Sequence, residues 1–249
     1  MRAMSAMTAA LRAELAPGGR LRVGINYGNF LLVRADAADG APQGIAPDLA
    51  RELARRTGVP VEFVRYEQAG KMADAVSGGA WDVAFLAAEP ARANAIAFTA
   101  AYLEIEAGYL VPPGSPIRTI DEVDRPGVRI AVANKAAYDL YLSRTLAHAE
   151  LVRAEGIPAS YELFVAQKLD ALSGLKPRLL EDVARLPGAR ILDGRFTAIQ
   201  QGIGTPVARA AAARYLHAFV EEMKASGQVA QAIARHGVRG VAVAPPAAA

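Results

Sequence analysis

Apolar and polar positions repeat with two different periods along this chain. From Leu21 onward, short apolar runs alternate with longer stretches in which apolar residues recur every three or four positions. The first pattern predicts strands and the second predicts amphipathic helices. The predicted strands cover 21–26, 59–66, 81–87, 128–133, 151–155, 169–172 and 189–194, and the predicted helices cover 47–58, 71–79, 136–150, 160–168, 176–188, 206–227 and 228–237. This alternation indicates an α/β fold with mostly parallel sheets.

Two extended segments interrupt the alternation, one reaching Val111 and the other around Gln200. They predict two lobes, each a mostly parallel sheet flanked by helices, joined by two hinge crossovers. Gly202 in the second crossover is expected to permit rotation. We assign residues 20–111 and 203–240 to lobe 1, 112–202 to lobe 2, 1–19 to an N-terminal extension and 241–249 to a disordered tail.

Composition narrows the classes of function. The 249 residues carry a net charge of only +3, dispersed along the chain, and 6% aromatic residues, so no nucleic-acid partner is expected. Cysteine is absent, which excludes disulfides, thiolate metal ligands and thiol catalysis. His148, His217 and His236 have no second ligand at metal-binding spacing, and the chain lacks a phosphate loop. We therefore expect no metal and no cofactor.

The first 19 residues predict a short amphipathic helix that ends at Pro17–Gly19. Arg12 and Glu14 interrupt any apolar run, so the sequence as written predicts neither a signal peptide nor a membrane span. The expected compartment is the cytoplasm for this chain as written, and the periplasm if the start has been trimmed or misassigned.

The stretch FLAAEPARANAIAF raises a question about charge. An apolar strand ends at Ala87, and Pro90 then suits the first position of a helix. Arg92 opposes the dipole of that predicted helix, which suggests an anion at the strand end. Ligands of open α/β sheets bind beyond the carboxyl ends of the strands, so the cleft between the lobes is the expected site. The alternative is a structural pair of Arg92 with Glu89.

The chain resembles the family 3 bacterial extracellular solute-binding proteins, the polar amino-acid receptors of ABC transporters with a type II periplasmic-binding-protein fold. The resemblance runs from Leu21 to Gly237 and includes LRVGINYGNF, GIAPDLARELARRTGVPVEFV, GGAWDVAFLAAEPARANAIAFTAAY and KLDAL. It implies a protein that closes two lobes over a small molecule, with an ABC permease as the partner for transport. We also expect a monomer.

The resemblance implies roles for several residues of lobe 1. In the family, the arginine at the position of Arg92 grips the α-carboxylate of the ligand, through the paired hydrogen bonds that a guanidinium offers. An aromatic ring after the first strand packs against the ligand, which implies this role for Tyr27 or Phe30. Asn29 stands where proline is frequent, and it either binds the ligand or braces the turn.

The sequence departs from the family pattern at the expected site. Ala87 replaces a serine or threonine, Glu89 replaces a threonine, and Lys135–Ala136 replaces a Gly-Thr whose donors bind the carboxylate. The acid that accepts the ligand's ammonium falls at Leu175. A zwitterion would therefore leave its ammonium poorly paired, at a cost of about several kcal/mol.

These departures predict a binding protein, without catalytic residues, for a carboxylate or other anion that lacks an α-amino group. Lys135 would add a second positive contact, and Tyr138 either faces the cleft or packs on residues 176–183. An inward-turned Glu89 is the route by which an ordinary amino acid would still bind. Three other classes stay open: a lyase resembling cyclohexadienyl dehydratase with Glu89 as general acid, a cytoplasmic metabolite sensor, and a LysR-type effector domain, although no helix-turn-helix is present.

Overall fold

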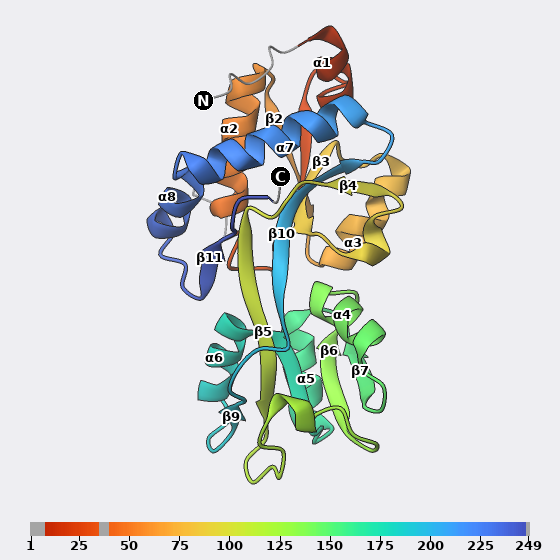
Figure 1. The fold of residues 1–249 in the computed structure, drawn as a ribbon, viewed down its shortest axis with the longest axis vertical. Coiled ribbons are helices and arrows are strands. Elements are labelled where there is room, and N and C mark those ends of the chain that lie inside the picture. The colour runs from red at the N-terminus through yellow and green to blue at the C-terminus, as the bar shows by residue number, and fades with distance from the viewer. Residues whose placement is uncertain (1–7, 35–39, 248–249) are drawn as a thin grey trace. The chain divides into compact units, whose positions relative to one another are not determined.

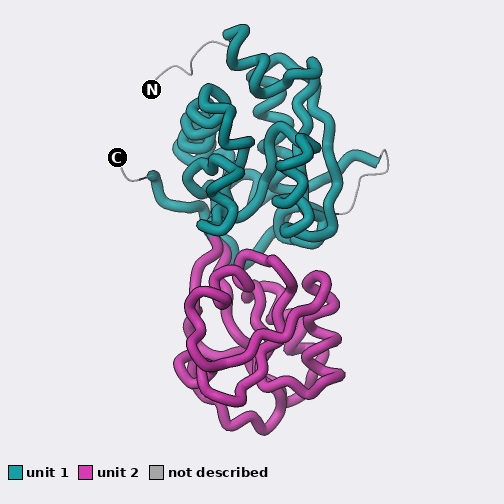
Figure 2. Tube along the Cα trace, turned by 90° about the vertical axis from the view of Figure 1, so that its right-hand side faces the viewer, with its two compact units in different colours: residues 1–104, 200–249 teal, residues 105–199 magenta. Residues whose placement is uncertain are grey.

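The computed structural model of the chain describes residues 8–34 and 40–247 and contains the predicted alternation of helices and strands (Figure 1). The chain forms two compact units, residues 1–104 with 200–249 and residues 105–199 (Figure 2). It leaves unit 1 near the start of β5 (Leu103–Val111) and returns within β10 (Thr197–Pro206). The boundaries predicted after residues 111 and 202 therefore fall at the end of one crossing strand and inside the other.

Unit 1 contains a sheet with the strand order β2-β1-β3-β10, and β4 also pairs with β10. Strands β1, β2 and β3 are parallel, whereas β10 runs antiparallel to β3. Besides β10, its elements are α1 Ala9–Leu15, β1 Leu21–Asn26, α2 Ile45–Thr57, β2 Val61–Tyr66, α3 Ala69–Asp74, η1 Ala75–Gly78, β3 Val83–Ala87, η2 Pro90–Arg92, β4 Ile96–Phe98, α7 Ala210–Ala225, α8 Gln228–Arg235 and β11 Val241–Val243.

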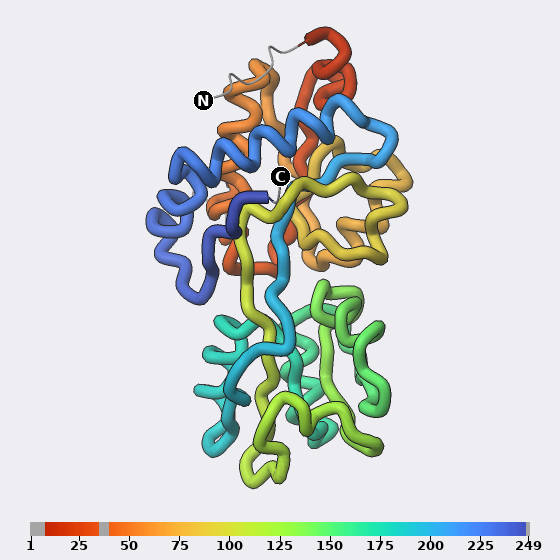
Figure 3. Tube along the Cα trace, in the orientation of Figure 1, coloured from red at the N-terminus to blue at the C-terminus, as the bar shows by residue number. Residues whose placement is uncertain are grey.

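The central strand β3 is buried at every position, as its continuous apolar run predicts for a strand covered on both faces. On one face, Trp81 packs with Met72 and Leu86, and its indole N–H donates to the Met72 carbonyl at 2.8 Å. Helix α2 ends at Gly58 in the left-handed conformation (φ 65°), as the sequence predicted. In the Cα trace of Figure 3, α8 lies beside α2.

The prediction of a helix that begins at Pro90 is wrong. Only a single 3₁₀ turn, Pro90–Arg92, follows β3. The chain then enters β4, where Ile96 pairs with Pro206 and is buried against the Trp81 cluster. The alanine-rich sequence suits a helix, but the burial of Ile96 and its place in the sheet ladder override that propensity.

The N-terminal segment is part of unit 1, contrary to its assignment as a separate extension. Leu11 and Leu15 of α1 are buried, and α1 contacts α7. The Glu14 carboxylate accepts a hydrogen bond from the Ala212 backbone N–H at 2.8 Å, in the first turn of α7, where a negative charge complements the helix dipole. The sequence could not supply this contact, because its partners lie 198 residues apart.

The prediction of a disordered tail is wrong for residues 241–247. Residues Val241–Val243 form β11, and the Ala244 backbone N–H donates to the Tyr102 carbonyl at 3.2 Å. The Lys224 ammonium donates to the Pro245 carbonyl at 2.8 Å, which fixes the segment to the end of α7. The alanine- and proline-rich composition suggested disorder, but these hydrogen bonds order the segment.

Unit 2 repeats the architecture with the strand order β5-β8-β6-β7, in which β6, β7 and β8 are parallel and β5 is antiparallel to β8. Its two faces carry separate apolar clusters, one around Tyr109 and Ile130 and the other around Phe164 and Leu172. Besides β5, the elements are η3 Ile120–Glu122, β6 Arg129–Ala133, α4 Ala137–Thr145, β7 Glu150–Ala154, α5 Ile157–Ala166, β8 Ala171–Leu175, α6 Lys176–Ala184 and β9 Arg190–Ile191.

Among residues 8–34 and 40–247, no helix is both long and apolar enough to cross a membrane.

Candidate functional site

The parallel strands of unit 1 end at one edge of its sheet. Strands β1, β2 and β3 run in the same direction and end at Asn26, Tyr66 and Ala87. The segments that follow them, 27–30, 67–68 and 88–92, therefore gather at this carboxyl edge. This is where open α/β sheets bind ligands, and five of the six predicted lobe 1 residues lie in these segments.

Arg92 lies at this edge, at the end of η2, and is only 6% exposed. Its Nη1 donates to the Ala87 carbonyl at 2.9 Å, which directs the guanidinium back toward the end of β3. Burial lowers the pKa of Arg92 to about 10, while the charges of Glu89 and Asp74 act in the opposite direction. The guanidinium is therefore charged at neutral pH although it is buried.

Glu89 is also buried, at 7% exposure, and immediately precedes η2. Because its charge favours the protonated form of Arg92, the two side chains act on each other electrostatically. Ala87 contributes its carbonyl to Arg92 and is 5% exposed. The structure thus brings Ala87, Glu89 and Arg92 together. The charge of Glu89 acts on Arg92, as expected if the two residues form a structural pair.

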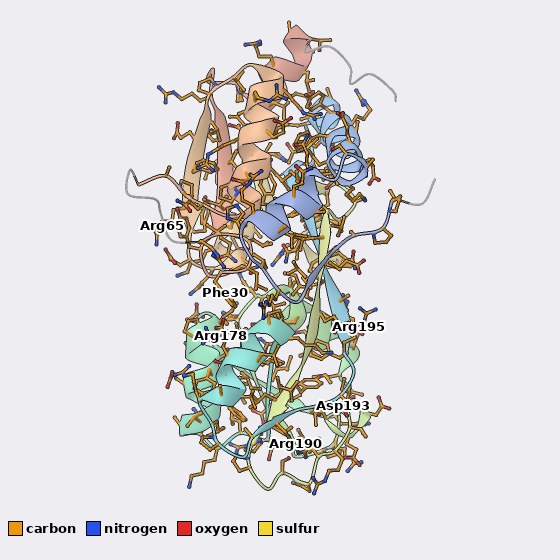
Figure 4. All side chains as sticks on the ribbon, turned by 90° about the vertical axis from the view of Figure 1, so that its left-hand side faces the viewer. Phe30, Arg65, Arg178, Arg190, Asp193 and Arg195 are labelled. Carbon is orange, nitrogen blue, oxygen red and sulfur yellow. The ribbon has the colours of Figure 1, made fainter. Side chains whose placement is uncertain are left out.

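The loop after β1 carries the other predicted contacts of unit 1. Asn29 braces the turn, because its Oδ1 accepts a hydrogen bond from the Leu31 backbone N–H at 3.3 Å. The ring of Tyr27 lies beneath Arg65, whose guanidinium carbon is 3.9 Å from the ring centroid. Phe30 is partly exposed, and Figure 4 labels it together with Arg65. Of the two rings, Tyr27 already stacks on a cation, whereas Phe30 is available as an apolar wall.

Sequence reasoning did not single out Arg65. This residue ends up at the edge because β2 pairs in parallel with β1, which places Arg65 beside Ile25. Its Nε lies 2.7 Å from the Glu67 carboxylate, so the pair carries little net charge. The only signal available in the sequence was its place near the end of a predicted strand.

Unit 2 has an equivalent carboxyl edge. The parallel strands β6, β7 and β8 end there at Ala133, Ala154 and Leu175. Lys135 and Ala136 follow β6 directly, and Ala136 is the N-cap of α4, as predicted for the head of this helix. The side chain of Lys135 is exposed.

Lys135 has an unusual backbone conformation, with φ at 55° in the left-handed region. This conformation costs a residue with a side chain about 1–2 kcal/mol relative to the right-handed region. Among the described non-glycine residues, only Lys168 shares it, and Lys168 closes the end of α5, where left-handed residues are common. Lys135 instead precedes a helix, so its conformation needs a specific local cause.

Asp139 contacts the backbone of Lys135, although the sequence analysis did not identify it as a site residue. Its Oδ2 accepts a hydrogen bond from the Lys135 backbone N–H at 2.8 Å. The carboxylate is 2% exposed and also accepts bonds from Arg153 at 3.0 and 3.2 Å. The three-residue spacing from the N-cap, typical of a capping box, was the signal that could have revealed it.

Tyr138 is 2% exposed and belongs to the interior of unit 2. The charges of Asp139 and, on α6, of Asp182 and Arg178 act on its hydroxyl. Burial is the largest cause of a raised pKa of Tyr138, so its hydroxyl stays protonated. Among the described side chains, this hydroxyl has no hydrogen-bond partner.

The Tyr138→Phe variant should therefore be more stable than the wild type by about 1 kcal/mol, because a buried hydroxyl without a partner costs free energy. Chemical denaturation without added ligand measures this change. Tyr102→Phe in unit 1 is the matched variant, since its hydroxyl is also buried and has no partner among the described side chains. If Tyr138→Phe is less stable than the wild type while Tyr102→Phe is not, the Tyr138 hydroxyl bonds to water or to a ligand.

The end of β8 carries a cationic cluster that sequence reasoning missed. Lys176 follows Leu175 and donates from Nζ to Glu106 Oε2 at 2.7 Å. Arg195 donates to the other carboxylate oxygen at 3.2 Å. The stem of Lys176 lies over Gly108, where an added Cβ would be 3.5 Å from its Cγ. The hydrogen bond from Lys176 is the main reason that the pKa of Glu106 lies below its ordinary value.

Each strand-end edge thus contains cationic groups, and Glu106, the acid beside Leu175, is already bonded to Lys176 and Arg195. Leu175 itself is 5% exposed and apolar. Within the ranges that the structure describes, no group of three histidine or acidic side chains could hold a metal ion. This arrangement can bind small anions by charge-assisted hydrogen bonds.

The fold and the two strand-end edges define a class of protein, the two-lobed binding proteins of periplasmic type. The model of the bacterial extracellular solute-binding proteins, family 3, matches residues 21–238. The chain belongs to this family. No curated protein sequence matches it.

Solved structures support the same fold. The L-cysteine solute receptor of Neisseria gonorrhoeae matches with a TM-score of 0.76 and 20% identity, over 94% of this chain and 96% of that one. A mutant of ArgBP from T. maritima matches with 0.74 and 22%, over 91% and 98%. The ancestral amino-acid-binding protein AncCDT-1, a precursor of cyclohexadienyl dehydratase, matches with 0.73 and 22%, over 93% and 100%.

Proposed function

We propose that this solute-binding protein captures a small carboxylate or another small anion that lacks an α-amino group. The observation that carries the proposal is the end of β8, where the resemblance places the acceptor for a ligand ammonium. Leu175 occupies that position, and the next residue is the cation Lys176. An ammonium at this edge would meet an apolar side chain and a like charge.

The nearest acid does not repair this defect. Glu106 lies close to Leu175, because its neighbour in β5, Ala107, is the register partner of Leu175 in β8. Both of its oxygens already accept hydrogen bonds, from Lys176 and from Arg195. Displacing these cations by a ligand ammonium would exchange one ion pair for another without a net gain.

Arg92 supplies the anchor in the proposal. A guanidinium can present two parallel N–H groups to a carboxylate, and one Arg92 nitrogen already holds the Ala87 carbonyl, which fixes its orientation. Phe30 provides the apolar wall in the proposal, and Lys135 is a second positive contact. Transport would require a membrane permease as the partner, and sensing would require none.

The printed names of similar structures include an L-cysteine receptor, an ArgBP and a Wolinella succinogenes protein complexed with lysine. These proteins share about a fifth of their residues with this chain, so their ligands do not transfer to it. A lyase is the weaker alternative, because the sequence matches no second acid or base to act with Glu89.

A thermal-shift panel tests the proposal, using protein that has been partly unfolded and dialysed to remove carried ligand. Propionate, succinate and glutarate are compared with their amino counterparts alanine, aspartate and glutamate. A ligand at about one hundred times its dissociation constant adds about 2.7 kcal/mol of stability. For a chain of this size, that corresponds to a rise in melting temperature of about 5–10 °C.

We expect a shift with at least one des-amino compound and a smaller or absent shift with its amino counterpart. Larger shifts with the amino acids would contradict the proposal and indicate that Glu89 accepts the ammonium. Proton NMR of the incubated mixtures would detect consumption of a compound, which would favour a lyase.

A further inference from the structure

A loop that binds an anion through its backbone needs N–H groups that can donate to the anion. In the loop between β6 and α4, these N–H groups already have partners within unit 2. The Asn134 N–H donates to the Ala154 carbonyl at 2.8 Å, and the Ala136 N–H donates to the Ala133 carbonyl at 3.1 Å. The Lys135 N–H donates to Asp139 at 2.8 Å. A ligand anion cannot use these donors without breaking internal bonds.

Neighbouring side chains hold the Asp139 carboxylate in place for its hydrogen bond with the Lys135 backbone N–H. Arg153, on β7, contacts the Asp139 carboxylate through Nε and Nη2, the latter at 2.9 Å. Arg153 Nη2 also donates to Ser143 Oγ at 2.8 Å, and Ser143 Oγ donates to Asp139 Oδ1 at 3.3 Å. Arg153 from β7 and Ser143 from α4 therefore fix one buried carboxylate beneath the loop.

An internal carboxylate thus takes the Lys135 N–H, and backbone carbonyls take the other two loop N–H groups. The Lys135 side chain, which is exposed, is the cation that the loop presents beyond its own backbone. A lysine is retained there in a conformation that glycine would adopt at no steric cost (φ 55°). Strained residues of this kind cluster at functional sites.

We infer that Asp139, clamped by Arg153, is the positioning residue that holds Lys135 in the left-handed conformation and makes the Lys135 ammonium the anion-binding group of this edge. The inference rests on the proposed function, because it assigns to Lys135 the role that the loop amides would otherwise have. It predicts that the protein selects ligands whose anionic group is bound by the Lys135 ammonium instead of by the backbone N–H groups of the loop.

The backbone half of the inference is tested without ligand. Lys135→Gly removes the strain and the charge, whereas Lys135→Met keeps the strain and removes only the charge. We expect Lys135→Gly to melt about 2–4 °C above wild type, and Lys135→Met to melt within about 1 °C of it. A Lys135→Gly protein that melts below Lys135→Met would overturn the backbone half.

The specificity half is tested by a double-mutant cycle with Asp139→Asn, using the panel compound that shifts the wild-type protein most. Asp139→Asn should weaken binding about tenfold in the wild-type background and less than about twofold in the Lys135→Met background. Its effect on melting temperature should be the same in both backgrounds. Equal losses of affinity in both backgrounds would show a structural role only and would overturn the inference.

The two failures are distinguishable. If no panel compound binds the wild-type protein, the proposed function and the specificity half fail together, and the Lys135→Gly comparison alone decides the backbone half. If a compound binds and the cycle shows no coupling, the proposed function stands and the inference fails.

Discussion

Asp82→Asn is expected to lower the free energy of unfolding by about 3 kcal/mol, because it removes one side of a buried ion-pair network. Asp82 is fully buried and precedes β3. Its carboxylate accepts bonds from Arg22 Nε and Nη2, both at 2.9 Å, and from Arg209 Nη1 at 2.7 Å. The same Arg209 nitrogen donates to the Glu14 carbonyl, so the network also connects α1 to the sheet. Urea denaturation measures the loss.

Asp170→Asn is the matched control in unit 2. Asp170 also precedes a buried strand and accepts the Arg129 backbone N–H at 2.8 Å, but its side chain is 42% exposed. We expect this variant to lose about 1 kcal/mol or less. Equal losses for the two variants would show that the arginines contribute nothing beyond a backbone hydrogen bond.

The network also predicts a dependence on pH. Burial raises the pKa of Asp82, but the hydrogen bonds from Arg22 and Arg209 outweigh it, so the pKa lies below its ordinary value of 3.8. Because the folded pKa is depressed, the stabilisation is fully present above pH 3.8 and is lost as the pH falls through the folded pKa. The stability difference between wild type and Asp82→Asn should therefore shrink in strong acid.

Arg92→Lys is expected to weaken binding of the best panel carboxylate by about thirtyfold, because an ammonium cannot reproduce the paired bonds of a guanidinium. Isothermal titration measures the change. Lysine keeps the charge beside buried Glu89, so this variant should fold. Arg92→Ala would leave Glu89 without that charge and is expected to lose about 3–5 kcal/mol of stability as well.

Arg55→Lys is the matched control, since Arg55 is a surface arginine of unit 1 whose side chain is 70% exposed and pairs with Glu52. Its affinity for the same compound should equal that of the wild type. If Arg92→Lys also binds with wild-type affinity, Arg92 is a structural residue that serves Glu89 and the Ala87 carbonyl, and the anchor must be sought elsewhere.

Much of the fold follows from local patterns in the sequence. The continuous apolar run at 81–87, the glycine stop at Gly58 and the restart of alternation after Val111 are local signals, and the structure contains β3, the end of α2 and the second unit. The misses are contacts between residues distant in sequence. Gly202, expected as a pivot, is paired in β10 and packs against Thr99, whose carbonyl would lie 3.3 Å from an added Cβ.

Side-chain partners were also beyond the sequence. Asp82 binds the side chains of Arg22 and Arg209, which lie 60 and 127 residues away in the sequence. His236 has an acidic neighbour from a distant part of the chain, since its Nε2 lies 2.9 Å from Asp48 Oδ2. The positions of Arg92 and Lys135 at strand ends were predictable from the βα pattern. Glu89 beside Arg92 and Asp139 near Lys135 are also local in the sequence, whereas the charges of Asp74 and Arg153 reach these groups only through tertiary packing.

The most direct test of the central claim is a calorimetric titration of wild-type protein with one matched pair, the best des-amino carboxylate of the panel and its amino counterpart. The account predicts that the des-amino compound binds at least about tenfold more tightly, because Leu175 and Lys176 offer no acceptor to an ammonium. Tighter binding of the amino acid would contradict the account and would assign the ammonium to Glu89.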